Sequence, residues 1–280
     1  MPESPEVDAL AAFLRDTLHG ARVGDTDLAE FRTLKTRARP PAELSGHVVT
    51  DVRRYGKHIA LVTDAAVLVI SFGRAGWARW LPVGAGAPAD PVADAPPAIA
   101  TIDFPERGAL ALTDAGQWLS IGVSIVDEPA DVPAIAKLGP DPTADDWSRT
   151  DLERVLGTRR KQVKALLQEQ ESLAGIGNAY SDEILFVARI SPLAHAADLT
   201  PAERDRLYDA IRSVLGEAFA ARRGVPPERQ KADKVASMRV HGRTGQPCPT
   251  CGGEVADVPG SKGTAQYCPA CQTGGVPQTG

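Results

Sequence analysis

The chain has 280 residues and a mass of 29.5 kDa, and 43% of its residues are hydrophobic while 24% are charged. This length predicts two or three domains, and the composition is that of a folded globular protein rather than a disordered or fibrous one. No apolar run approaches the ~20 residues of a membrane span, so we expect no membrane association. The first residues are acidic where a targeting peptide needs basic ones, and we therefore expect a cytoplasmic protein.

The net charge of −5 conceals an uneven distribution along the chain. Residues 1–149 hold 14 Lys and Arg against 21 Asp and Glu, whereas residues 150–280 hold 17 against 15. Basic residues cluster at 159–164, at 222–243 and at 32–39. Because the field at a surface follows local patches, these clusters leave an anionic partner open, and solvated charged faces explain each of them about equally well.

The first predicted element is an amphipathic helix close to the N-terminus. Its apolar residues recur at the spacing of one helix face: Val7, Leu10, Ala11, Leu14 and Leu18. Ser4 is the expected N-cap, with Pro5 at the first helical position. Residues 47–72 and 100–126 hold short apolar or alternating runs, which are typical of strands. Without a glycine-rich nucleotide loop or a regular βαβ alternation, the pattern favours an antiparallel sandwich or barrel.

The remaining segments differ in composition and in the structure that they predict. The Ala-, Pro- and Gly-rich segment 82–98 is predicted to be a loop between strands. The run Thr200-Pro-Ala-Glu203 has the residues of a capping box with proline at the first helical position. We expect five parts in chain order: a sandwich over 1–126, a linker over 127–149, a helical domain over 150–235, a cysteine module over 236–272 and a disordered tail over 273–280.

Four cysteines form the most specific local pattern. Cys248 and Cys251 are followed after sixteen residues by Cys268 and Cys271. Two such pairs of thiolates create a tetrahedral site that suits zinc, and four protein ligands leave no open position, so the zinc is expected to be structural. Two redox-active pairs are the less favoured alternative, since no thioredoxin-like βαβ pattern surrounds them.

A glycine-rich turn interrupts the helical region. Residues 161–170 are predicted to be helical, and Gly175 and Gly177 then allow close backbone approach before Asn178, the expected N-cap of the next helix. The start of a helix after such a turn can bind a phosphate, and Lys164 could add a positive charge. An ordinary helical hairpin explains these residues equally well.

Leu173–Phe186 resembles the helix–two-turn–helix signature of the formamidopyrimidine-DNA glycosylase and endonuclease VIII family, in which it precedes a four-cysteine zinc finger. Three further motifs resemble family patterns in the same order: Met1-Pro-Glu-Ser-Pro-Glu-Val, Leu138-Gly-Pro-Asp-Pro and Val240-His-Gly-Arg-Thr-Gly-Gln-Pro-Cys. The chain is therefore identified as a divergent, actinobacterial-like member. The resemblance implies an α+β multidomain fold: an N-terminal antiparallel β-sandwich with flanking helices, a helical helix–two-turn–helix domain and a zinc ribbon.

The resemblance implies a nucleophile at the N-terminus. Met1 is removed, and the nitrogen of Pro2 attacks C1′ of the damaged nucleotide to form a Schiff base. An α-amino group with a pKa near ~8 is partly neutral at physiological pH, unlike a lysine near ~10.4. Glu3 is the implied general acid and base, and Glu6 assists proton transfer. Without the other motifs, Pro2 reads as an arbitrary second residue and both glutamates as helix-start acids.

The resemblance also assigns contacts to the DNA backbone. Lys57, in the turn between two strands, is implied to contact the phosphate beside the lesion, although a solvated turn lysine is the simpler alternative. Asn178 carries over as a phosphate contact of the two-turn element, with Lys164 near it. Lys262 stands on the zinc-finger hairpin where arginine is usual, six residues before Cys268 and one more than in common members.

Two loops depart from the family pattern. Family members fill the gap left by the flipped base with a methionine from one loop and an arginine and a phenylalanine from another. Ser71-Phe-Gly-Arg-Ala-Gly places Arg74 at the methionine position, and Asp103-Phe-Pro-Glu-Arg-Gly places Glu106 and Arg107 at the other two. An arginine cannot replace an apolar wedge, so these changes leave the lesion undefined.

We therefore expect a bifunctional DNA glycosylase and abasic-site lyase that acts on damaged, oxidised bases in double-stranded DNA. It is expected to be a monomer with one structural zinc ion, associated with the nucleoid in a bacterium. The first alternative is a DNA-structure or abasic-site binding protein that does not excise bases. The second is an RNA-binding zinc-ribbon protein, which leaves the N-terminal motif unexplained.

Overall fold

The computed structural model describes residues 1–84 and 96–276, which divide into two compact units. Unit 1 comprises residues 1–137 and 223–230, and unit 2 comprises residues 138–222 and 231–280. Most of the predicted loop 82–98 and half of the predicted tail 273–280 lie outside the described residues. Among the helices that are described, none has the length and apolar character needed to cross a membrane.

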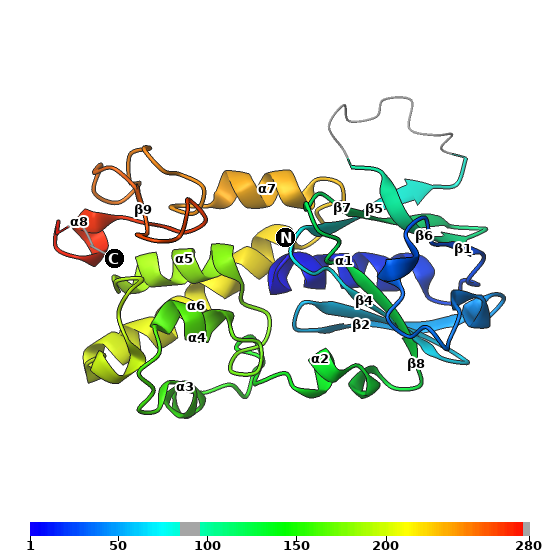
Figure 1. Cartoon of the computed structure of the whole chain (residues 1–280), viewed down its shortest axis with the longest axis horizontal. Coiled ribbons are helices and arrows are strands. Elements are labelled where there is room, and N and C mark those ends of the chain that lie inside the picture. The colour runs from blue at the N-terminus through cyan, green and yellow to red at the C-terminus, as the bar shows by residue number, and fades with distance from the viewer. Residues whose placement is uncertain (85–95, 277–280) are drawn as a thin grey trace. The chain divides into compact units, whose positions relative to one another are not determined.

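Unit 1 contains two four-stranded antiparallel sheets, as the strand patterns predict (Figure 1). Their strands are β1 Thr26–Asp27, β2 Val49–Tyr55, β3 His58–Thr63, β4 Val67–Ser71, β5 Gly76–Pro82, β6 Ala98–Phe104, β7 Gly108–Asp114 and β8 Gly122–Val126. One sheet has the order β1-β6-β7-β5 and the other the order β2-β3-β4-β8. Apolar residues of both sheets and of the first helix form one core, so the antiparallel sandwich is confirmed.

Helix α1, Ser4–Leu18, buries the apolar stripe that the sequence predicts, with Val7, Leu14 and Leu18 fully buried. Its N-cap is Glu3 rather than Ser4. The Glu3 N–H donates to the carboxylate of Glu6 at 2.9 Å in a capping box, and this glutamate pair replaces the expected serine cap. Ser4 is the first helical residue, and its buried hydroxyl has no hydrogen-bond partner.

Short helices connect the main elements of unit 1. They are η1 Phe31–Thr33, η2 Pro41–Leu44, η3 Pro129–Asp131 and α2 Pro133–Ala136. The last two lie in the stretch predicted to be a linker, and the boundary between the units follows at Lys137.

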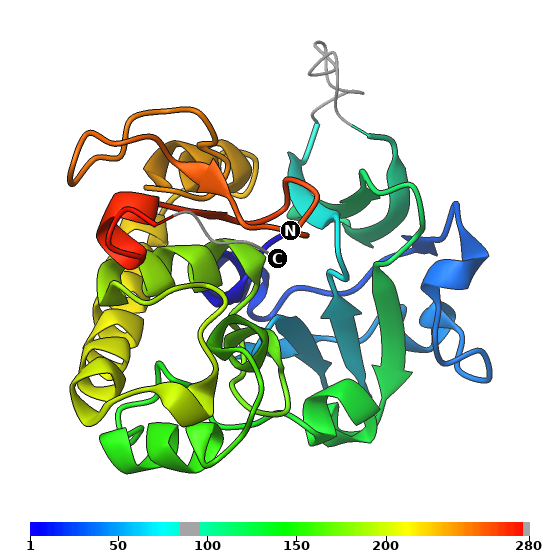
Figure 2. The same ribbon diagram turned by 60° about the vertical axis from the view of Figure 1, so that its left-hand side comes forward.

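Unit 2 is built around helices α5 and α6, which pack side by side (Figure 2). Its elements are α3 Arg149–Leu156, α4 Val163–Gln168, α5 Asn178–Ala188, η4 Ala196–Asp198, α6 Pro201–Arg222, α7 Gln230–Ser237, β9 Ala256–Asp257, β10 Gln266–Tyr267 and α8 Pro269–Gln272. The capping box of α6 is confirmed, because Thr200 N–H donates to Glu203 at 2.9 Å and Glu203 N–H donates to the Thr200 hydroxyl at 3.3 Å.

Candidate functional site

Three turns of unit 1 lie together at one end of the sandwich, which we call the loop end. They are the β2–β3 turn at 56–57, the β4–β5 turn at 72–75 and the β7–β8 loop at 115–121. The strand register requires this grouping, because Ser71 pairs with both His58 and Gly122 while Gly76 pairs with Asp114.

The start of the chain also lies at the loop end. Pro2 is buried and lines a small cavity together with Phe72 of the β4–β5 turn. The other lining residues are Glu6, Leu10, Trp77, Ala78, Pro227 and Gln230. At about 10 Å³ this cavity has room for roughly one water molecule. With Met1 in place the nitrogen of Pro2 is an amide nitrogen, so it becomes a basic amine only once Met1 is removed.

Glu3 and Glu6 flank Pro2 in the first turn of α1. Both residues are almost completely buried, at 1% and 2% exposure. The capping contact accounts for one carboxylate oxygen of Glu6, and the same side chain lines the cavity beside Pro2. The two predicted acids are thus next to the predicted nucleophile rather than in solvent.

Lys57 occupies the two-residue turn between β2 and β3. Gly56 precedes it with φ +54°, as a hairpin turn with glycine in its first position requires. Burial, together with the charge of Lys57, lowers the pKa of the adjacent His58 to about 4. His58 is therefore neutral at physiological pH, and the positive charge of this turn is that of Lys57.

Arg74 is exposed on the β4–β5 turn, which is held against the β7–β8 loop. The Arg74 N–H donates to the Ser120 hydroxyl at 2.8 Å. Gly73 has φ +56°, and a Cβ at this position would lie 2.1 Å from the Ser120 carbonyl oxygen. Only glycine permits this close approach of the two loops.

The β7–β8 loop presents Trp118, which is 85% exposed. The Asp114 carboxylate orders this loop by accepting from the N–H groups of Ser120 at 2.8 Å and Gly116 at 2.9 Å. Burial alone would raise the pKa of Asp114, but these donors outweigh it and the pKa is lowered. Sequence reasoning missed Trp118, although the tryptophan in the strand-to-strand connection Gly116-Gln-Trp-Leu-Ser120 is an available signal.

The prediction that Arg107 and Arg74 stand on two neighbouring loops that fill the same gap does not agree with the strand register. Arg107 lies in the β6–β7 turn, next to the pairing of Gly108 with Pro82, whereas the loop end lies at Asp114. Six residues of extended strand separate these ends, about 20 Å. Glu106 belongs to the same distant turn. The loop that faces Arg74 is therefore 115–121, and Trp118 is its exposed aromatic residue.

In unit 2, Asn178 is the first residue of α5, and its N-cap is Gly177 rather than Asn178 itself. The Asn178 side chain is used elsewhere: its Oδ1 accepts from Gln168 at 3.0 Å, and its Nδ2 donates to the Thr264 carbonyl. Asn178 thereby joins the two-turn element to the β9–β10 hairpin.

Lys262 is exposed near the tip of the β9–β10 hairpin. Its φ is +54°, a left-handed conformation that is uncommon for lysine. Because Asn178 contacts Thr264 in the same hairpin, the structure brings two of the predicted phosphate contacts into one region of unit 2.

Lys164 was predicted to add a positive charge to a phosphate site near Asn178, and the structure places it in an ion pair within the protein. Its side chain is 13% exposed and forms an ion pair with Asp182. The same ammonium donates to the Ser181 hydroxyl at 3.0 Å and the Asn178 carbonyl at 3.4 Å. These contacts tie the Lys164 ammonium group to α5, so in this structure Lys164 supports the two-turn element.

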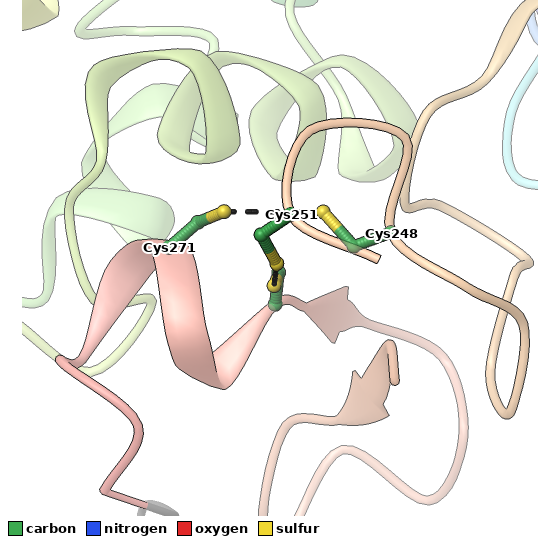
Figure 3. Close-up of side chains that lie close together, drawn as sticks. Cys248, Cys251 and Cys271 are labelled. Atoms are coloured by element: carbon green, nitrogen blue, oxygen red, sulfur yellow. Dashed lines mark hydrogen bonds between the residues drawn. The ribbon is translucent and has the colours of Figure 1, made fainter. Parts of the chain in front are cut away.

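The four cysteines converge as the spacing predicts, with sulfur atoms pointing toward one another (Figure 3). Cys248 and Cys271 are 3.9 Å apart at Sγ, and Cys251 and Cys268 are 3.5 Å apart. Tetrahedral zinc with Zn–S bonds near 2.3 Å sets the sulfurs about 3.8 Å apart, so the cluster fits this ion. A disulfide would require about 2.05 Å.

Comparison with protein families gives two matches that together cover most of the chain. Residues 1–118 match the formamidopyrimidine-DNA glycosylase N-terminal domain, and residues 138–226 match the formamidopyrimidine-DNA glycosylase H2TH domain. The formamidopyrimidine-DNA glycosylase of Heliobacterium modesticaldum is 31% identical over 97% of this chain and 100% of its own length. The chain therefore belongs to the formamidopyrimidine-DNA glycosylase family.

Further relatives agree in sequence and structure. An uncharacterized formamidopyrimidine-DNA glycosylase-like protein of Mycobacterium tuberculosis is 45% identical over 146 residues, which cover 52% of this chain and 91% of the relative. The MutM (Fpg) protein of Thermus thermophilus matches at a TM-score of 0.78 and 28% identity, over 97% of this chain and 98% of that one. MutM in complex with DNA containing carbocyclic 8-oxo-G matches at 0.82 and 25% identity, over 97% and 100%.

Proposed function

We propose that this protein is a DNA glycosylase for damaged bases that also cleaves the resulting abasic site. Family membership supports glycosylase activity. The observation that carries the proposal is the position of Pro2 between Glu3, Glu6 and the loop end, where Lys57, Arg74 and Trp118 also lie.

Removal of Met1 converts the nitrogen of Pro2 into a secondary amine. Its lone pair attacks C1′, the glycosidic bond breaks, and the base leaves with the bonding electrons and takes up a proton. The attacking amine loses its own proton, and the C1′–O4′ bond then breaks while O4′ takes up a proton, so the sugar ring opens and an iminium forms at C1′. This iminium carries its positive charge without a proton on nitrogen, and it acidifies C2′. Loss of a C2′ proton then expels the 3′ phosphate, so one nucleophile accounts for both steps.

Glu3 and Glu6 supply the proton transfers. Glu3 follows the nucleophile directly, and Glu6 lines the same cavity. A carboxyl group in this position can donate to the sugar ring oxygen or the leaving base and accept the proton lost in elimination.

The other residues hold the DNA in place. Lys57 contacts the phosphate beside the lesion, while Asn178 and Lys262 contact phosphates from unit 2. Phosphate contacts position the duplex without reading its sequence. Zinc, bound by the four cysteines, supplies no reactive group and stabilises the hairpin that carries Lys262.

Trp118 and Arg74 are proposed to fill the gap that a flipped nucleotide leaves in the duplex. Trp118→Ala is expected to weaken binding of a duplex with one tetrahydrofuran abasic analogue by about 10- to 100-fold, because stacking is worth ~1–3 kcal/mol per base. Trp118→Phe should retain most of the affinity, and Arg107→Ala at the distant turn should change it little. Equal losses for Trp118→Ala and Arg107→Ala in fluorescence anisotropy would contradict this placement.

A panel of duplexes, each with one defined lesion or one abasic site, tests the proposed function. Protein without Met1 should release damaged bases and nick the abasic duplex, and borohydride should trap a covalent adduct. Tight binding across the panel without release, nicking or adduct would instead support the DNA-structure binding protein. Preferential binding of single-stranded RNA over the abasic duplex would support the RNA-binding alternative.

A further inference from the structure

Asp182 of α5 has an unusual environment for a carboxylate. Its side chain has no exposed surface, although an ionised carboxylate is costly to bury unless it is paired and hydrogen-bonded. No role is assigned to it by the proposed reaction, and it lies one turn after Asn178 on the same helix.

Three separate elements contact this carboxylate. Lys164 of α4 donates to Oδ1 in an ion pair. His241, which follows α7, places Nδ1 2.7 Å from Oδ2, and the Gln266 N–H of β10 donates to Oδ2 at 3.2 Å. Asp182 therefore joins the two-turn element both to the entry of the cysteine module and to its hairpin.

The neighbouring Glu183 reinforces the same junction. Its buried carboxylate accepts from the N–H groups of Arg239 at 2.8 Å, Val240 at 2.9 Å and His241 at 3.0 Å. Asp182 differs from it by reaching the strand β10 of the hairpin itself.

A short path leads from Asp182 to both phosphate contacts of unit 2. Lys164 bridges Asp182 to Ser181 and to the Asn178 carbonyl. On the other side, Gln266 belongs to the hairpin strand that follows Lys262, and Thr264 of that hairpin accepts from Asn178. Displacement of Asp182 would therefore change the position of Lys262 relative to Asn178.

We propose that Asp182 is a positioning residue for DNA binding, which locks the β9–β10 hairpin onto α5 so that Lys262 and Asn178 contact neighbouring phosphates together. The inference rests on the proposed DNA contacts but not on turnover. The buried ion pair of Lys164 and Asp182, with the hydrogen bonds of Asp182 to His241 and Gln266, specifies one docking of the hairpin, whereas an apolar contact of similar area would tolerate several.

Asp182→Asn tests the inference because it keeps the side-chain volume and removes the charge. Its dissociation constant for the tetrahydrofuran duplex is expected to rise about 10-fold or more. Its slope of log affinity against log salt is expected to fall by about 0.9, the value for one lost phosphate contact. Bound zinc should remain at one ion per chain, and a purely structural defect would reduce the folded fraction without changing the salt slope.

Asp205→Asn is the matched control, since Asp205 pairs with Arg149 on the surface of the same unit. His241→Gln serves as a second variant should Asp182→Asn fail to fold, and it is expected to lower the salt slope in the same direction. An unchanged affinity and salt slope in a folded, zinc-loaded variant would overturn the inference. Because the readout is binding, a wild-type protein that binds DNA without cleaving it would refute only the proposed function.

Discussion

Protein whose N-terminus is blocked is expected to lose abasic-site cleavage almost completely, by on the order of 10³- to 10⁶-fold. With Met1 or a tag still attached, the nitrogen of Pro2 is an amide whose lone pair is delocalised, so it cannot attack C1′. No iminium forms, and the elimination step loses its electron sink. The measurement is nicking of an abasic duplex together with borohydride trapping of the adduct.

The matched control carries the same tag at the C-terminus, and mass spectrometry confirms that its Met1 has been removed. Both preparations should bind the tetrahydrofuran duplex with similar affinity, because the blocked group makes a bond to the sugar rather than a contact with phosphates. A trapped adduct of undiminished yield from the blocked protein would identify another nucleophile, such as a lysine.

Loss of zinc is expected to reduce DNA affinity by about 100-fold or more. The cysteine module has only small apolar clusters: Val240, Val255, Cys248 and Cys268 pack with Phe186 of α5, and Val258, Ala265 and Tyr267 form the other. Such clusters cannot fold alone, and structural zinc contributes about 10–16 kcal/mol to domains of this kind. Without the ion, the hairpin that carries Lys262 loses its fixed position.

Cys268→Ser and treatment with a strong chelator should both show this loss of affinity. Affinity is measured with the tetrahydrofuran duplex, and the metal content of the same samples is measured by atomic emission. Thr250→Ala, a change between the two cysteines of the first pair, is the control and should retain the metal. Full affinity in a metal-free protein would show that the ribbon takes no part in binding.

Local sequence patterns were sufficient wherever neighbouring residues determine the outcome. The four cysteines converge as predicted. The close spacing within each Cys-x2-Cys pair places two sulfurs on one turn, so only the two turns have to come together. The capping box of α6 and the apolar face of α1 are also confirmed. The ends of helices were less certain: Glu3 and Gly177 replaced Ser4 and Asn178 as N-caps, since neighbouring residues compete for each cap.

Contacts between distant residues required the tertiary structure. The pairing of β5 with β7 determines that the β7–β8 loop faces Arg74. The sequence prediction assigned this place to the β6–β7 turn, which carries a similar short motif. Lys164 resembled a phosphate ligand because its partner Asp182 stands eighteen residues away. The sequence alone therefore determined the fold class, the family resemblance and the cluster of four cysteines, which depend on local spacing and hydrophobic periodicity. Only the tertiary structure decided the positions of Trp118 and Arg107 and the ion pair of Lys164, because strand register and buried charge pairing arise from residues that come together only on folding.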